Sequence, residues 1–277
     1  MTQGKKKVAI LGPRGTFSEE AAARFFRDPD FLLADDIEEV FENVVAGKAD
    51  YGIVPVENSL EGSVGMTMEM LLKEGAKIYG EVTLDIKQQL LAPEGVKLNE
   101  IKVVASHPHA LAQCKEFIRK YNFTPANYAS TAEAAREIAR LKTPGTAAIA
   151  SETAASMYGL RVIKRDIQDD YLNKTRFLVI HRGDHPQTGN DKTSIVIGLE
   201  DKPGALYELL GAFAERQINL TKIESRPSRK ALGDYIFYID LEGHRTDPFV
   251  EDVLSDLKRR SSFLKVLGSY PKAGPIK

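Results

Sequence analysis

Short apolar runs alternate along the chain with longer stretches in which apolar residues recur every three or four positions. This pattern predicts strands joined by helices, as in an α/β fold. The first example is an apolar strand over 8–11 followed by GPRGTFSEE, where Thr16 and Glu19 have the spacing of a helix capping box. A glycine turn from a strand into a helix leaves backbone amides free. It is either an anion site or a plain βα connection.

The same pattern predicts the later elements of the first two thirds of the chain. They are a helix from Asp36 to Gly47, a strand over 51–54 that stops at Pro55, an extended stretch over 77–92, a strand over 102–105, a helix that Ser106 caps with Pro108 in its first turn, a helix capped by Ser130 and Glu133, a strand over 146–150 and a short helix ending at Gly159. The long extended stretch in mid-chain suits a crossover between two lobes.

Polar residues gather where two of the predicted strands end. Glu57, Asn58 and Ser59 follow Pro55, and DYLNKTRFLVI places Thr175 and Arg176 at the mouth of an apolar strand. Ligands of open α/β sheets bind at such edges. We therefore expect a ligand site there, although a helix cap and an ordinary polar strand end are the alternatives.

Thr175 and Arg176 bring complementary chemistry to this edge. A threonine hydroxyl donates one hydrogen bond, and a guanidinium holds a carboxylate with two. A chain that leaves a first lobe, builds a second and returns places 173–177 at the hinge between them. Such interfaces are favoured places for small-molecule sites.

The pattern changes after the turn-rich segment His181–Lys192. The elements expected beyond it are a strand over 193–199, a helix over 205–216, paired strands over 220–225 and 234–241, a helix over 249–260 and a strand over 263–270. The order βαββαβ predicts a ferredoxin-like domain.

Composition excludes several classes of protein. The 277 residues are 43% hydrophobic and 28% charged with a net charge of −1, so we expect a globular protein with neither nucleic acid nor membrane as partner. Cys114 is the only cysteine, which rules out an intramolecular disulfide. His107 and His109, two apart in a first helical turn, should not face each other, and no metal-ligand spacing occurs.

The N-terminal segment and the lengths of the apolar runs predict the cellular compartment of the protein. MTQGKKKVAI has no apolar region typical of a signal peptide, and no run is long enough to span a bilayer. We expect a cytoplasmic protein.

Several motifs in this order resemble one family. GPRGTFSE, VPVENSLEGSV, SHPHALAQC, STAEAA, AAIAS and NKTRF are similar to motifs of monofunctional prephenate dehydratases, and PGALYELL and ESRP to those of their ACT domain. The resemblance implies a two-lobed α/β catalytic domain like type 2 periplasmic binding proteins, followed by an α+β ferredoxin-like ACT domain. The implied boundaries are a catalytic domain over 1–182 (first lobe about 1–80 and 170–182, second lobe about 81–169), a linker over 183–192 and the ACT domain over 193–277.

The resemblance also implies an activity. Prephenate would become phenylpyruvate, carbon dioxide and water in phenylalanine biosynthesis, without a cofactor, under feedback by L-phenylalanine at the ACT domain of a homodimer or homotetramer. Two alternatives stay open. One is an arogenate dehydratase, whose substrate carries an amino group in place of the keto oxygen. The other is a non-catalytic solute-binding or amino-acid sensor protein.

Family site residues carry over to matching positions. The catalytic set is Thr175, Arg176, Asn173 and Ser59. The substrate-binding set is Thr16, Ser18, Glu57, Asn58, His107, Ser130, Thr131 and Phe177. The effector set is Gly204, Ala205, Leu206, Asn219, Leu220, Glu224, Ser225, Arg226 and Pro227.

The chemistry of prephenate suggests roles for some of them. Hydroxide leaves poorly, so we expect Thr175 to hydrogen-bond the departing hydroxyl, through Ser59 or a water if a relay is needed. Arg176 would clamp the pyruvyl carboxylate, and the departing ring carboxylate would lie near Phe177. Glu57 would orient Asn58 or a basic residue without touching the substrate, because a carboxylate repels an anion.

The chain departs from the family pattern at two positions. His109 stands where glutamine is usual after His-Pro, and Tyr207 ends a motif that usually reads GALV.

Overall fold

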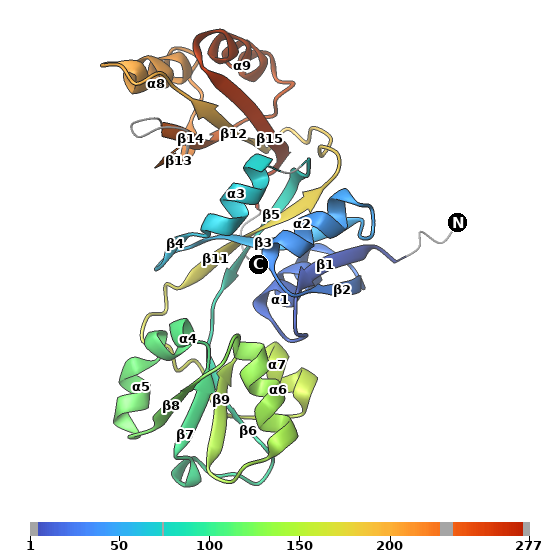
Figure 1. Ribbon diagram of the computed structural model, residues 1–277, viewed down its shortest axis with the longest axis vertical. Helices are drawn as coiled ribbons and strands as arrows, with labels where there is room; N and C mark the ends of the chain where they lie inside the picture. The colour runs from blue at the N-terminus through green and yellow to red at the C-terminus, as the bar shows by residue number, and fades with distance from the viewer. Residues whose placement is uncertain (1–4, 74, 228–234, 274–277) are drawn as a thin grey trace. The chain divides into compact units, whose positions relative to one another are not determined.

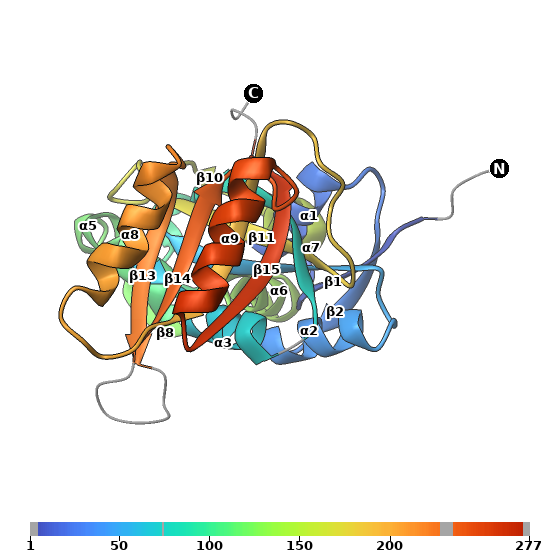
Figure 2. The same cartoon turned by 90° about the horizontal axis from the view of Figure 1, so that it is seen from above.

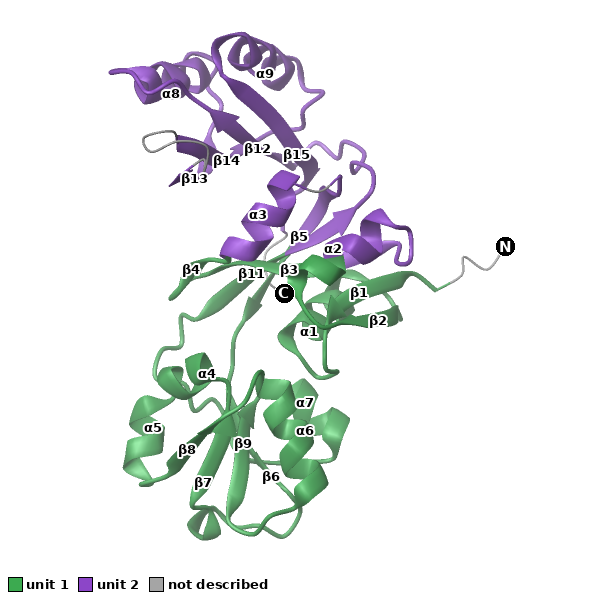
Figure 3. Cartoon of the chain, viewed as in Figure 1, with its two compact units in different colours: residues 1–40, 53–64, 82–177 green, residues 41–52, 65–81, 178–277 purple. Residues whose placement is uncertain are grey.

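A computed structural model describes residues 5–73, 75–227 and 235–273 (Figure 1). The chain forms two compact units (Figure 3). The first comprises residues 1–40, 53–64 and 82–177, and the second residues 41–52, 65–81 and 178–277.

The described residues form sheets of order β2-β1-β3-β11-β5, with β4 paired to β3, of order β10-β6-β9-β7-β8, and of order β13-β14-β12-β15. The strands are β1 (Lys7–Leu11), β2 (Asp30–Ala34), β3 (Tyr51–Asn58), β4 (Gly62–Ser63), β5 (Lys77–Asp85), β6 (Gln89–Ala92), β7 (Val103–Ser106), β8 (Thr124–Asn127), β9 (Thr146–Ala150), β10 (Arg161–Lys164), β11 (Lys174–His181), β12 (Asp191–Gly198), β13 (Leu220–Pro227), β14 (Tyr235–Glu242) and β15 (Phe263–Pro271). The helices are α1 (Phe17–Phe25), α2 (Ile37–Val45), α3 (Gly65–Lys73), the 3₁₀ turn η1 (Leu98–Glu100), α4 (Pro108–Gln113), α5 (Lys115–Lys120), α6 (Thr131–Leu141), α7 (Glu152–Tyr158), α8 (Ala205–Glu215) and α9 (Pro248–Arg260).

Helix starts agree well with the sequence pattern. Thr16 caps α1 by accepting from the Glu19 amide at 3.3 Å, and Ser130 caps α6 by accepting from the Glu133 amide at 3.0 Å. In α1 the Glu19 carboxylate reaches back to the Gly15 amide at 2.7 Å, one residue before the cap. These side-chain bonds satisfy amides that have no partner inside the helix.

The predicted stop of a strand at Pro55 is wrong. β3 continues to Asn58, where β4 pairs with Glu57 and Asn58, and the Ser59 amide donates to Lys174 O at 2.9 Å. Proline removes a single ladder donor, and the pairing beyond it holds the strand. Glu57 and Asn58 are therefore the last residues of a strand and not loop residues.

The extended stretch over 77–92 crosses between sheets, as predicted, because β5 belongs to the first sheet and β6 to the second. In the second sheet β7 lies parallel to β8 and to β9, so their carboxyl ends share one edge. The predicted Ser106 cap is wrong. Ser106 ends β7, buried, with its Oγ donating to Ile149 O at 2.6 Å, and His107 caps α4.

The C-terminal sheet has the ferredoxin-like order that the sequence predicts. Ile195 and Ile197 of β12 pack against Phe213 of α8 and Val253 of α9 in one buried cluster. Figure 2 shows these two helices side by side over the sheet.

The other face of that sheet holds α3 inside the second unit. The Tyr238 hydroxyl donates to Met68 O at 2.9 Å, and Lys265 Nζ donates to Leu71 O at 3.0 Å and to Leu72 O at 2.7 Å. Leu71 and Leu72 lie in the last turn of α3, where carbonyls lack partners inside the helix and favour a cation.

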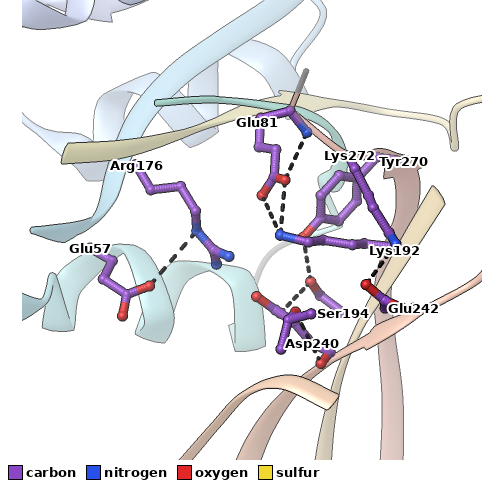
Figure 4. A network of polar contacts seen from close by, with 11 residues as sticks. Glu57, Glu81, Arg176, Lys192, Ser194, Asp240, Glu242, Tyr270 and Lys272 are labelled. Atoms are coloured by element: carbon purple, nitrogen blue, oxygen red, sulfur yellow. Dashed lines mark hydrogen bonds and ion pairs between the residues drawn. The ribbon is translucent and has the colours of Figure 1, made fainter. Parts of the chain in front are cut away.

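Buried polar groups also line this face (Figure 4). Lys192 Nζ lies 2.9 Å from Glu81 Oε1, which also accepts from the Ala273 amide at 2.9 Å. Close by, the Ser194 hydroxyl donates to Asp240 at 2.6 Å and contacts the Tyr270 hydroxyl at 2.7 Å.

Candidate active site

Thr175 and Asn58 meet where β11 begins and β3 ends. Asn58 Nδ2 donates to Thr175 Oγ1 at 2.9 Å, and Thr175 is 8% exposed. The orientation of the Asn58 amide follows from its other partners, because its Oδ1 accepts from the backbone amides of Leu60 at 2.9 Å and Glu61 at 3.1 Å. Thr175 Oγ1 thus accepts a hydrogen bond from Asn58 and keeps its own proton for another acceptor.

Further amides extend this contact. Asn58 Nδ2 also donates to Asn173 Oδ1 at 2.8 Å, Asn173 Nδ2 donates to Gln113 Oε1 at 3.0 Å, and Gln113 Nε2 donates to Glu61 Oε1 at 3.1 Å. Sequence reasoning missed Gln113 and Glu61. A signal existed for Gln113, since it lies four residues after His109 and shares its helix face.

Ser59 holds the segment before Thr175. Its Oγ donates to Leu172 O at 3.0 Å and accepts from the Lys174 amide at 2.9 Å. The hydroxyl proton is bonded to the backbone, so the proposed relay through Ser59 does not fit this geometry. Ser59 orients the strand that carries Thr175.

Arg176 lies on the opposite face of the sheet from Thr175. Neighbouring strand residues point to opposite faces. Arg176 Nε lies 3.8 Å from Glu57 Oε2 (Figure 4), whereas Phe177, 3% exposed, shares the face of Thr175. The expectation that Thr175 and Arg176 grip one substrate together does not fit this separation. Glu57 accompanies a basic residue, as expected.

The first loop is built around Glu19. The Glu19 carboxylate accepts from Arg14 Nη2 and from the Gly15 amide, both at 2.7 Å. Thr16 Oγ1 donates to Leu11 O at 3.1 Å, and Ser18 is 4% exposed in α1. Thr16 therefore shapes the loop, with its hydroxyl proton bonded inside it.

This loop contacts the second sheet's helix α7. Ser151 Oγ donates to Gly15 O at 2.9 Å, and the Tyr158 hydroxyl donates to Arg14 O at 2.6 Å. Gly15 has a φ of +84°, and a Cβ there would lie 3.0 Å from Ala154 Cα. Glycine is needed here for both backbone and space.

The remaining substrate candidates lie at helix starts beyond the parallel strands. His107 caps α4 after β7, Ser130 caps α6, and Thr131 is the first residue of α6. Hydrogen bonds join Asn58 to Asn173 and Thr175, and Ser59 bonds the backbone beside them. The structure places Thr16, Ser18, His107, Ser130 and Thr131 in separate local contacts at helix N-termini.

His107 and His109 do face each other, contrary to the sequence prediction. Their ring centroids are 4.9 Å apart, because His107 has extended backbone (φ −65°, ψ 143°) and not the helical backbone assumed. His107 Nδ1 accepts from the His109 amide at 3.2 Å. In the described part of the chain, no three His, Cys, Asp or Glu residues are placed to hold a metal.

The pKa of His107 gives a pH prediction. Burial, then His109, lower this pKa from its ordinary 6.5, and Glu61 opposes them. A lowered pKa means that the folded state prefers neutral His107, so the resulting stability is present above about pH 6.5 and is lost as pH falls through the lowered pKa. We expect His109→Gln to raise the pKa of His107 in an NMR titration, since one cause of the lowering is gone. An unchanged or lower value would contradict this.

A cavity of about 820 Å³ borders the Asn58 cluster. It is lined by Asn58, Leu60, Glu61, Gly62, Ser63, Val64, His109, Ala112, Gln113, Asp169 and Asp170. Carboxylates of Glu61, Asp169 and Asp170 disfavour a dianion here. Asn58 lines this cavity, and Thr175 does not.

The effector candidates fall into groups at two ends of the C-terminal domain. Gly204, with φ +87°, begins α8, and Arg226 Nε donates to Glu224 at 2.9 Å near the end of β13. Asn219 and Leu220 stand at the start of that strand, about 20 Å from its end at ~3.3 Å per residue. Within one chain they cannot share a small ligand with Glu224 and Arg226. The other candidates, placed beside these, are Ala205, Leu206, Ser225 and Pro227.

Comparison with known families identifies the family of this chain. The family model "Prephenate dehydratase" matches residues 8–185, and "ACT domain" matches residues 193–259. The chain belongs to the prephenate dehydratase family. Prephenate dehydratase of Methanocaldococcus jannaschii is 44% identical over 276 residues, which covers 96% of this chain and 98% of the relative.

Two further proteins similar to this chain match most of its length. "Arogenate dehydratase/prephenate dehydratase 2, chloroplastic" of Arabidopsis thaliana is 42% identical over 276 residues, covering 96% of this chain and 72% of the relative. A crystal structure of prephenate dehydratase in complex with L-Phe from Arthrobacter aurescens superposes with a TM-score of 0.88 at 38% identity, covering 96% and 90% of the two chains. These matches support the two-lobed fold with a ferredoxin-like ACT domain.

Proposed function

We propose that this protein converts prephenate into phenylpyruvate, carbon dioxide and water, with Thr175 as the catalytic residue. The observation that carries the proposal is the hydrogen bond from Asn58 Nδ2 to Thr175 Oγ1, which leaves the threonine proton available in a largely buried place. A member of the prephenate dehydratase family needs such a donor for the hydroxyl that departs.

Two bonds of prephenate break in this reaction. The bond between the ring and its carboxylate breaks, carbon dioxide leaves, and that electron pair completes the aromatic ring. The carbon–oxygen bond breaks at the same time and its electron pair goes to the oxygen. The departing hydroxyl takes up one proton, supplied by solvent, to become water. Thr175 donates a hydrogen bond to this oxygen as its negative charge grows, and aromatisation supplies the driving force.

The substrate's carboxylates need other partners than Arg176. We propose the free amides at the starts of α1 and α6, near Thr16, Ser18, Ser130 and Thr131, because helix N-termini attract anions. His107, kept neutral by its lowered pKa, can donate from Nε2 while its Nδ1 caps α4. Phe177 supplies an apolar surface near the carboxylate that must depart uncharged.

Substrate choice is tested by comparing prephenate with arogenate at equal enzyme concentration. We expect a higher kcat/KM with prephenate. A higher value with arogenate would favour the alternative activity. Binding without turnover of either substrate would favour the sensor-protein alternative.

We also propose a setting and an assembly. The catalytic domain spans 1–182, the linker 183–192 and the ACT domain 193–277, in a cytoplasmic homodimer or homotetramer. Exposed apolar residues of the ACT domain, among them Leu206, Tyr207 and Ile223, support self-association. In the described ranges, no helix is long and apolar enough to cross a membrane.

L-Phenylalanine is the effector that we propose. Asn219 lies at the far end of β13 from Glu224. These two groups of effector residues can therefore contact one L-phenylalanine only if a second subunit supplies one group. Such an arrangement makes the effector site depend on the oligomer.

Lys265 offers a test of how the effector signal reaches α3. Its ammonium bonds Leu71 O and Leu72 O, so Lys265→Met loosens the ACT sheet from α3. We expect basal turnover within about twofold and an inhibition constant for L-phenylalanine raised at least about fivefold, the low end of allosteric coupling energies. Lys258→Met, at an exposed position of α9, is the control. Unchanged inhibition in Lys265→Met would contradict this coupling.

A further inference from the structure

Glu61 closes a ring of hydrogen bonds around the residue that orients Thr175. Its backbone amide donates to Asn58 Oδ1 at 3.1 Å, and its Oε1 accepts from Gln113 at 3.1 Å. Asn58 in turn connects through Asn173 to Gln113, at 2.8 and 3.0 Å. The ring therefore joins both functional groups of the Asn58 amide to Glu61, by backbone on one side and by side chains on the other.

The donors in this ring all point the same way. Asn58 donates to Asn173, Asn173 to Gln113, and Gln113 to the Glu61 carboxylate. An anion at the end of such a chain polarises each amide toward itself. Reversal of any amide would place two donors or two acceptors against each other. The Glu61 carboxylate therefore reinforces the direction that the backbone amides of Leu60 and Glu61 set at Asn58.

His109 holds the second oxygen of Glu61. The distance from His109 Nδ1 to Glu61 Oε2 is 2.5 Å. His109 and Gln113 lie four residues apart on α4, so one helix face supplies both side-chain donors to the carboxylate. His109, which stands where the family usually has glutamine, therefore contacts a carboxylate of this ring.

We propose that Glu61 is a positioning residue for Thr175 and that His109 holds Glu61 in place. The inference rests on the proposed function and adds to it two residues outside the predicted catalytic, substrate and effector sets. Glu61 acts through Asn58, which sets the direction of the Thr175 proton. Neither Glu61 nor His109 needs to touch the substrate.

An ordinary surface ion pair would have no effect on turnover. His109 and Glu61 side chains are 64% and 39% exposed, and pairs this exposed contribute little to stability. The ring makes a different prediction, because the Glu61 contacts control the orientation of a buried catalytic hydroxyl. A surface ion pair and a positioning role for Glu61 therefore predict different values of kcat in the variants and similar melting temperatures.

The experiment measures kcat and KM for prephenate in the full chain and in variants. We expect Glu61→Ala to lower kcat about tenfold, the effect of losing one hydrogen bond, with KM within about twofold. Glu61→Gln should recover most of kcat, since its carbonyl still accepts from Gln113. His109→Ala should lower kcat about threefold, and His109→Gln should restore it because glutamine can donate to Glu61.

The double variant gives the sharpest result. If His109 acts through Glu61, Glu61→Ala with His109→Ala should lose no more activity than Glu61→Ala alone. Independent, multiplying losses would overturn the role of His109. Glu137→Gln breaks the exposed pair with Arg140 on α6, at 2.7 Å, and is the matched control with wild-type kcat.

Failure of the inference and failure of the proposed function look different. Wild-type turnover with an unchanged Glu61→Ala kcat would overturn the inference and leave the function intact. A wild type inactive on prephenate would overturn the function. A crystal structure of Glu61→Ala then tests the ring without turnover. A displaced Asn58 amide supports the inference, and an unchanged contact from Asn58 to Thr175 overturns it.

Discussion

Thr175→Ala is expected to lower kcat for prephenate by about 10²–10⁴, the usual effect of removing a catalytic hydrogen-bond donor. The Thr175 hydroxyl accepts from Asn58 at 2.9 Å and is 8% exposed, so its proton faces little competition from water. Alanine leaves the departing hydroxyl without this donor while the strand around it stays paired. KM should change much less than kcat, because the interaction forms mainly as charge develops.

Thr175→Ser is the matched variant, since serine keeps the hydroxyl and loses only the methyl group. We expect it to retain a substantial part of kcat, although a less restrained χ1 will lower it. Steady-state kinetics beside thermal melting separate chemistry from folding. Thr175→Ala with near-wild-type kcat would remove Thr175 from the mechanism.

Lys192→Met is expected to lower the free energy of unfolding by about 3–5 kcal/mol, because it removes the ammonium that pairs with the buried Glu81 carboxylate. The Glu81 side chain is 3% exposed and that of Lys192 is 15% exposed, at a separation of 2.9 Å. The Ala273 amide still bonds Glu81 but carries no full charge. At about 2–4 °C per kcal/mol, the melting temperature should fall by roughly 10 °C.

Lys272→Met is the control for this prediction. Lys272 pairs with Glu242 at 2.6 Å, with side chains 26% and 39% exposed, so its loss should cost at most about 1 kcal/mol. Adding Glu81→Leu to Lys192→Met should recover most of the lost stability, since the buried carboxylate is removed together with its ammonium partner. Equal melting temperatures for Lys192→Met and Lys272→Met would show that burial does not govern this pair.

Local chemistry made several helix starts predictable. Thr16 and Ser130 cap helices through bonds to residues three positions away, so sequence spacing alone reveals them. The C-terminal domain was predictable for a similar reason, because its strands and helices are long and separated by clear turns. No strand was predicted at β2 or β10. The short strand β10 gains its partner, β6, from a distant part of the chain.

The sequence predicted part of the cluster around Thr175, and it predicted the geometry of that cluster less well. Thr175, Asn58 and Asn173 meet as expected of one site. The position of Arg176 could not be predicted in the same way. Its placement on the face opposite Thr175 depends on where β11 begins and which face of the sheet is buried. Gln113 and Glu61 come from segments over fifty residues apart, so only the folded chain brings them together.

The most direct measurement is kcat for prephenate in Asn58→Asp. Aspartate has nearly the same shape as asparagine but accepts where Asn58 Nδ2 donates, so Thr175 would donate its hydrogen bond to residue 58 and not to the departing hydroxyl. If Asn58 directs that hydrogen bond, kcat falls at least about 100-fold, within the range for a lost catalytic donor, while the melting curve shows a folded protein. A folded Asn58→Asp variant with wild-type kcat would contradict this orientation of Thr175.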